Sequence, residues 1–108
     1  MADAHEAYLV QILLPLWDNR GEPLESHLYA VVRRVLVERF GGLTAYARSP
    51  AEGIWRRPDD QPVRDQIVVF EVMVAEFDLP WWQQYRARLE QAFRQDTVVV
   101  RAQMTVVI

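Results

Sequence analysis

The chain has 108 residues, the length of a single domain, and its 51% hydrophobic and 25% charged residues are typical of a globular protein rather than a disordered one. The net charge is −3 and no basic stripe is present, so we expect neither nucleic acid nor an anionic membrane as a partner. Cysteine is absent and all twelve basic residues are arginine, which excludes thiolate nucleophiles, cysteine-ligated zinc and Schiff-base lysine chemistry.

The first seven residues differ from the rest of the chain. Residues 1–7 contain Asp3, His5 and Glu6 and lack the basic start of a signal peptide. We therefore expect a flexible N-terminus followed by one domain over residues 8–108. The apolar runs that follow are much shorter than the roughly 20 residues of a membrane-spanning helix, so the sequence predicts a cytoplasmic protein.

Three segments have the patterns of strands. Residues 8–17 (YLVQILLPLW) and 66–75 (QIVVFEVMVA) are nearly continuous apolar runs, which predict central strands covered on both faces. Residues 97–107 alternate strictly between two faces, which predicts a half-buried edge strand. One face of this last strand carries Val98, Val100 and Met104, and the other carries Val99, Arg101 and Gln103.

Two segments have apolar residues at helical spacing. Residues 23–40 predict a helix with Pro23 in its first turn and a stop at Gly41-Gly42. Residues 80–94 predict a second helix with Asp78 near its N-cap. Its apolar stripe consists of Trp82, Tyr85, Leu89 and Phe93.

The middle of the chain is less regular. Residues 44–48 favour a short strand, which residues 53–55 could continue or follow as a hairpin arm. Residues 56–62 are polar, contain Pro58 and Pro62, and read as a loop. This middle region therefore supplies one strand of the domain and its longest connection.

The order of these elements predicts an α+β domain with a ferredoxin-like βαββαβ layout. Such domains have a four-stranded antiparallel sheet in the order 4-1-3-2. Right-handed crossovers place both helices on one face of the sheet. The opposite face is then left without helical cover, and its residues become the candidate functional surface.

Alternation places three polar residues on that bare face. Gln11 of the first strand, Glu71 of the third and Arg101 of the fourth fall on adjacent strands, with Arg101 and Glu71 about 10 Å apart at their backbones. Tyr46 and Arg48 share one side of the second strand, whose facing the sequence leaves undetermined. We take these five residues as candidate ligand-binding residues.

The surroundings of these residues are apolar. Leu9, Leu13, Val69 and Met73 fall on the same face, which is too hydrophobic to be left in water and too polar for a simple core. Packing against a second copy resolves this conflict, and a two-fold dimer is the commonest oligomer. The sequence therefore predicts a homodimer that encloses the polar residues between two sheets.

A family resemblance is carried by the segment Glu38-Arg39-Phe40-Gly41-Gly42-Leu43-Thr44 and by Trp55 after a glycine. Through these residues the chain resembles short bacterial ferredoxin-like proteins of unknown function over nearly its whole length. Its layout is similar to that of dimeric α/β-barrel proteins, a group that includes cofactor-free monooxygenases, isomerases, haem-degrading enzymes and plain binding proteins. The resemblance implies a fold and a mode of pairing, and it assigns no catalytic residue.

Two functions remain open. The first is a homodimeric binding protein for a small amphipathic molecule, in which Glu71 forms an ion pair with Arg101 or Arg48 that fixes the dimer register. The alternative is a cofactor-independent enzyme, a monooxygenase or isomerase, with Glu71 as general base and Arg101 holding an anionic oxygen. Neither requires a cofactor.

Other chemistry-bearing residues give weaker signals. His5 and His27 have no metal-ligand spacing, so we expect no metal site. The two serines lie outside any nucleophile-elbow motif, which argues against a serine hydrolase. Trp81 and Trp82 are adjacent and cannot share one helix face, so one should pack on the sheet and the other on a loop or interface.

Overall fold

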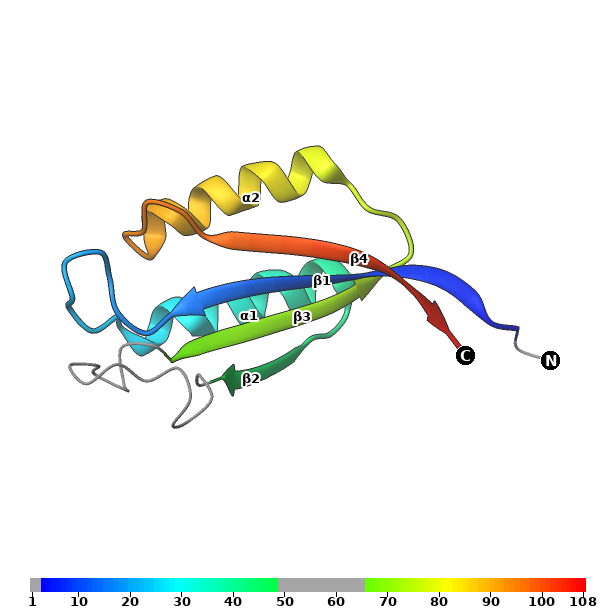
Figure 1. The fold of residues 1–108 in the computed structure, drawn as a ribbon, viewed down its shortest axis with the longest axis horizontal. Helices are drawn as coiled ribbons and strands as arrows, with labels where there is room; N and C mark the ends of the chain where they lie inside the picture. Colours follow the sequence, from blue (N-terminus) through cyan, green and yellow to red (C-terminus); the bar gives the residue numbers. More distant parts are fainter. Residues whose placement is uncertain (1–2, 49–65) are drawn as a thin grey trace, which may run out of the picture.

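The computed structural model describes residues 3–48 and 66–108, which fold into four strands and two helices (Figure 1). The elements follow in the predicted order β-α-β-β-α-β. Their bounds are β1 His5–Pro15, α1 Ser26–Phe40, β2 Thr44–Arg48, β3 Ile67–Val74, α2 Leu79–Ala92 and β4 Val99–Val107. The expected extension of β2 at 53–55, the loop at 56–62 and Trp55 lie outside the described residues.

The four strands form one antiparallel sheet in the order β2-β3-β1-β4. This is the order 4-1-3-2 read from the other edge, so the predicted ferredoxin-like topology is confirmed. The two continuous apolar segments, β1 and β3, are the central strands. The short β2 and the alternating β4 form the edges, where a strand has only one hydrogen-bonded neighbour.

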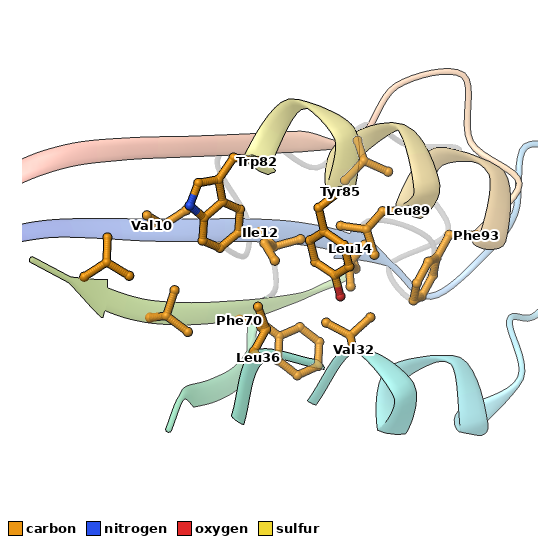
Figure 2. Packing of buried hydrophobic residues seen from close by; sticks show 13 residues of the cluster. Val10, Ile12, Leu14, Val32, Leu36, Phe70, Trp82, Tyr85, Leu89 and Phe93 are labelled. Carbon is orange, nitrogen blue, oxygen red and sulfur yellow. The ribbon is translucent and has the colours of Figure 1, made fainter. Parts of the chain in front are cut away.

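The hydrophobic core lies between one face of the sheet and both helices. Alternate residues of β1, namely Val10, Ile12 and Leu14, are buried on this face, and Phe70 and Val72 of β3 join them. The helices contribute Val32 and Leu36 of α1 and Trp82, Tyr85 and Leu89 of α2 (Figure 2). Both helices therefore cover the same face, as predicted, and neither covers the other one.

α1 begins at Ser26 rather than at Pro23, and the predicted helix start is wrong. Pro23 instead pairs with Trp17 in an isolated antiparallel bridge, and the N–H of Leu24 donates to the carbonyl of Leu16. These contacts join the two ends of the β1–α1 connection. The connection therefore keeps Pro23 in an extended pairing that a helical turn would break.

Asp18 organises the same connection. Its Oδ1 accepts hydrogen bonds from the backbone N–H groups of Arg20 and Glu22, both at 2.9 Å. Its Oδ2 accepts from Nε of Arg94 at 3.0 Å, and Arg94 also pairs with Glu25 at 3.4 Å. The bond from the Glu22 N–H is the main reason that the pKa of Asp18 is lowered. This network ties the loop after β1 to the residues that follow α2.

α2 begins as the sequence predicts. Asp78 is the N-cap, and its Oδ1 accepts from the backbone N–H of Trp81 at 3.2 Å. Pro80 lies in the first turn, where its missing N–H has no helical partner to lose. The cap fixes where the helix starts and hence which of its residues face the sheet.

The prediction for the two adjacent tryptophans holds for Trp82 but not for Trp81, which packs on helix residues rather than on a loop, with the two rings in edge-to-face contact at 4.8 Å. Trp82 is buried in the core, where its ring stacks on Phe40 at a centroid distance of 5.2 Å. Trp81 is only partly buried and stacks on Tyr85, while the Arg39 guanidinium lies 4.3 Å from its ring centroid. The Trp81 face of α2 therefore joins α2 to the end of α1 rather than to the sheet.

The sheet extends beyond the helices at the end where both termini lie (Figure 1). β1 begins at His5, earlier than the pattern of apolar residues predicts, because His5, Glu6 and Ala7 pair with the last residues of β4. Met104 and Val106 lie on the helix side of this extension, yet both are exposed because neither α1 nor α2 reaches them. Neither helix has the length and apolar run needed to cross a membrane.

Tyr85 carries a buried hydroxyl for which the described residues supply no hydrogen-bond partner. Its ring reaches from α2 toward α1 (Figure 2), and burial raises its pKa to about 12. We expect Tyr85→Phe to leave the free energy of unfolding unchanged or to raise it by up to about 1 kcal/mol, because it removes an unsatisfied polar group. Urea denaturation measures the change.

Tyr29 gives a matched control for this prediction. Its hydroxyl donates to the carbonyl of Pro15, so Tyr29→Phe should lower the free energy of unfolding by about 1 kcal/mol. A loss of stability in Tyr85→Phe as large as that in Tyr29→Phe would contradict the assignment of Tyr85 as unsatisfied.

Candidate functional site

Four paired residues, one from each strand, cross the bare face of the sheet from edge to edge. Thr44 of β2 pairs with Glu71 of β3, Glu71 pairs with Gln11 of β1, and Gln11 pairs with Arg101 of β4. Gln11 and Glu71 alternate with buried core residues of β1 and β3, and Arg101 follows Val100, which is partly buried against the core. The structure therefore brings these three polar residues together on one face, as the alternation predicts.

Hydrogen bonds join three of these side chains to one another and to Tyr46, a neighbour on β2. Nε of Arg101 donates to Oε1 of Gln11 at 2.7 Å, and Nε2 of Gln11 donates to Oε1 of Glu71 at 2.6 Å. The hydroxyl of Tyr46 donates to the same Oε1 of Glu71 at 2.7 Å. Gln11 and Glu71 are half-buried, whereas Tyr46 and Arg101 are exposed. We call Gln11, Tyr46, Glu71 and Arg101 the polar row.

The expected ion pair between Arg101 and Glu71 is not direct. Gln11 lies between them and uses both ends of its amide, one as acceptor and the other as donor. Among the described side chains, Glu71 forms no salt bridge within 4.0 Å. The strand between the two charges keeps them too far apart for contact, so the carboxylate is held by neutral donors.

The facing of β2, which the sequence leaves undetermined, is resolved by its register with β3. Tyr46 pairs with Val69, so its ring lies on the bare face. Arg48 is the last residue of β2 and pairs with Ile67, but its side chain lies outside the described part of the chain. Tyr46 is therefore placed with the polar row, and the role expected of Arg48 stays a prediction.

Apolar residues surround the polar row on the same face. Leu9 and Met73 pair on one side of it, and Leu13 and Val69 pair on the other. Val69 is buried, whereas Met73 and Val99 are 51% and 47% exposed. A single chain thus leaves apolar surface uncovered next to half-buried polar groups.

An open hollow of about 420 Å³ adjoins Glu71, and no pattern in the sequence predicts it. It forms where β2 begins, because β3 continues past Glu71 to Val74 with no partner on that side among the described strands. The turn between α1 and β2 closes its rim. The lining residues are Leu9, Phe40, Gly41, Gly42, Leu43, Thr44, Glu71, Val72 and Met73.

This arrangement combines an oriented carboxylate with neighbouring apolar side chains. Two donors on one oxygen of Glu71 fix the plane of the carboxylate, and the surrounding residues give a ligand apolar surface to cover. Such a mixture of a few placed polar groups and an apolar lining is typical of small-molecule sites. It is also compatible with acid–base chemistry at Glu71.

No protein-family model matches the chain, and a search of curated proteins finds no match. Among solved structures, the chain is similar to a phage SAM lyase in complex with S-methyl-5'-thioadenosine. The two share 14% identity with a TM-score of 0.57, over 94% of this chain and 88% of the other. At this identity the similarity shows the fold alone, and it extends over nearly the whole domain.

Proposed function

We propose that the chain forms a homodimer whose bare sheet faces enclose a small amphipathic ligand. The polar row, Gln11, Tyr46, Glu71 and Arg101, would make the polar contacts, and Arg48 is the fifth residue that we propose for this site. The observation that carries the proposal is the hydrogen-bonded polar row within an apolar sheet face that neither helix covers.

Two further features support this proposal. Val99 and Met73 on this face are half exposed, and a soluble chain gains by burying such residues against a partner. The structure of similar fold is a protein with a bound nucleoside derivative, so this fold can host a small-molecule site. The similarity in fold does not choose the ligand for this chain.

Solution mass is the direct test of the assembly. Sedimentation velocity across the micromolar range should give a particle of twice the 12.7 kDa chain mass. A particle that stays monomeric over the whole range would contradict the enclosed site, because the bare face would then be open to water.

A second candidate is a cofactor-independent enzyme, a monooxygenase, isomerase or lyase, in which Glu71 removes a proton from the substrate. It is favoured by the two hydrogen bonds that orient the Glu71 carboxylate and by the lyase activity in the name of the structure with similar fold.

SAM is the first substrate to test for this second candidate. Incubation with the protein should consume SAM, as followed by chromatography, and Glu71→Gln should slow its loss about 100-fold or more because the general base is removed. Glu22→Gln, which removes a carboxylate in the β1–α1 connection, should not change the rate. No loss of SAM above a protein-free control would argue against a lyase reaction on this compound.

A further inference from the structure

The described residues that line the hollow beside Glu71 carry negative charge alone. Among them, only Glu71 is ionisable. The Arg101 guanidinium is two strands away, and its Nε is engaged with Gln11. Arg39, next to Phe40 in the chain, lies over the Trp81 ring and 3.6 Å from the Asp78 carboxylate. Neither arginine is among the residues that line the hollow.

The Glu71 carboxylate keeps hydrogen-bonding capacity for a ligand. Both hydrogen bonds that the described residues make to Glu71 go to Oε1, from Gln11 and Tyr46. Each carboxylate oxygen has two lone pairs, so Oε2 is available to accept from a ligand. A ligand group with N–H donors and a positive charge satisfies this oxygen better than a neutral one.

Apolar side chains line part of the hollow. Leu9, Leu43 and Met73 supply hydrophobic surface around Glu71. Gly41 has a φ of +84°, which favours glycine there, and a Cβ added to Gly41 or Gly42 would meet no atom within 4 Å. The turn therefore bounds the hollow without filling it.

We infer that this hollow binds the positively charged end of a small organic cation against Glu71, with the apolar part of the same molecule on Leu9, Leu43 and Met73. The inference rests on the proposed function and specifies it, because it names the charge of the ligand. A cation is selected since Glu71 is the single charge among the described lining residues, and no arginine in residues 3–47 or 66–108 forms a salt bridge with it.

Three probes of similar shape and different charge test this inference. They are 2-phenylethylammonium, 2-phenylethanol and 3-phenylpropanoate, titrated into the full chain and followed through the backbone amide NMR signals of Gly41, Gly42 and Thr44. We expect the cation to bind about tenfold or more tightly than the alcohol, and the carboxylate to bind weakest.

Two variants test whether the charge of Glu71 causes the preference for the cation over the alcohol. Glu71→Gln keeps acceptors for Tyr46 and Gln11 but removes the charge, so the cation and the alcohol should then bind equally. Glu22→Gln makes the same change in net charge in the β1–α1 connection and should leave the preference intact. Equal binding of cation and alcohol to the unmodified chain would overturn the cation inference while leaving a ligand site on this face. No amide shift with any probe would overturn both.

Discussion

Phe70→Ala should lower the free energy of unfolding by about 3–5 kcal/mol. Phe70 is 1% exposed and lies in the centre of the core, on the central strand β3 (Figure 2). Removing its ring leaves a cavity that β1 and the two helices cannot fill without moving, because all of them are held by the sheet and by each other. Urea denaturation followed by tryptophan fluorescence measures the loss.

Two further variants keep this prediction testable if Phe70→Ala fails to fold. Phe70→Leu retains most of the side-chain volume and should lose clearly less stability than the alanine variant. Val31→Ala, at a position 47% exposed on α1, should change the free energy of unfolding by less than about 0.5 kcal/mol. A loss below about 1 kcal/mol in Phe70→Ala would contradict the central position of this ring.

Val99→Arg should convert the proposed dimer into a folded monomer. Val99 is 47% exposed on the bare face, so an arginine there is tolerated in a single chain. In the dimer the same guanidinium would be buried without a partner. We expect the dissociation constant to rise about 100-fold or more, which sedimentation velocity measures.

Val106→Arg is the matched control. Val106 is on the same strand and is 62% exposed, but it lies on the other side of the sheet, beyond the helices. Its replacement should leave the dimer unchanged, and circular dichroism should show that both variants remain folded. A dimer that survives Val99→Arg, or one that is lost only in Val106→Arg, would place the interface elsewhere than on the bare face.

The fold follows from patterns that are local in the sequence. The continuous apolar runs of β1 and β3, the alternation of β4 and the cap at Asp78 each predict an element, and the short list of allowed topologies then gives the sheet order. The starts of β1 and α1 were predicted wrongly for one physical reason. His5 is in a strand because β4 pairs with it, and Pro23 is outside a helix because Trp17 pairs with it. Contacts between distant residues do not show in a local pattern.

In the candidate site, too, some features follow from local sequence and others depend on contacts between distant residues. Alternation is enough to place Gln11, Glu71 and Arg101 on one face, because the side of a strand on which a residue lies is a local property. The position of Tyr46 depends on the register between β2 and β3. The hollow depends on β2 starting opposite Glu71, which no residue near Glu71 encodes. The sequence therefore predicts the members of the polar row better than the space beside it.

The amide of Gln11 has one consequence for how this face can vary. A half rotation about its last side-chain bond exchanges the accepting oxygen and the donating nitrogen. A chain in which the acid stood on β4 and the base on β3 would satisfy the same glutamine in its flipped orientation. The glutamine can thus join an acid and a base in either order across the sheet. A substitution that reverses the charge at Glu71 can therefore be compensated by the opposite substitution at Arg101, two strands away.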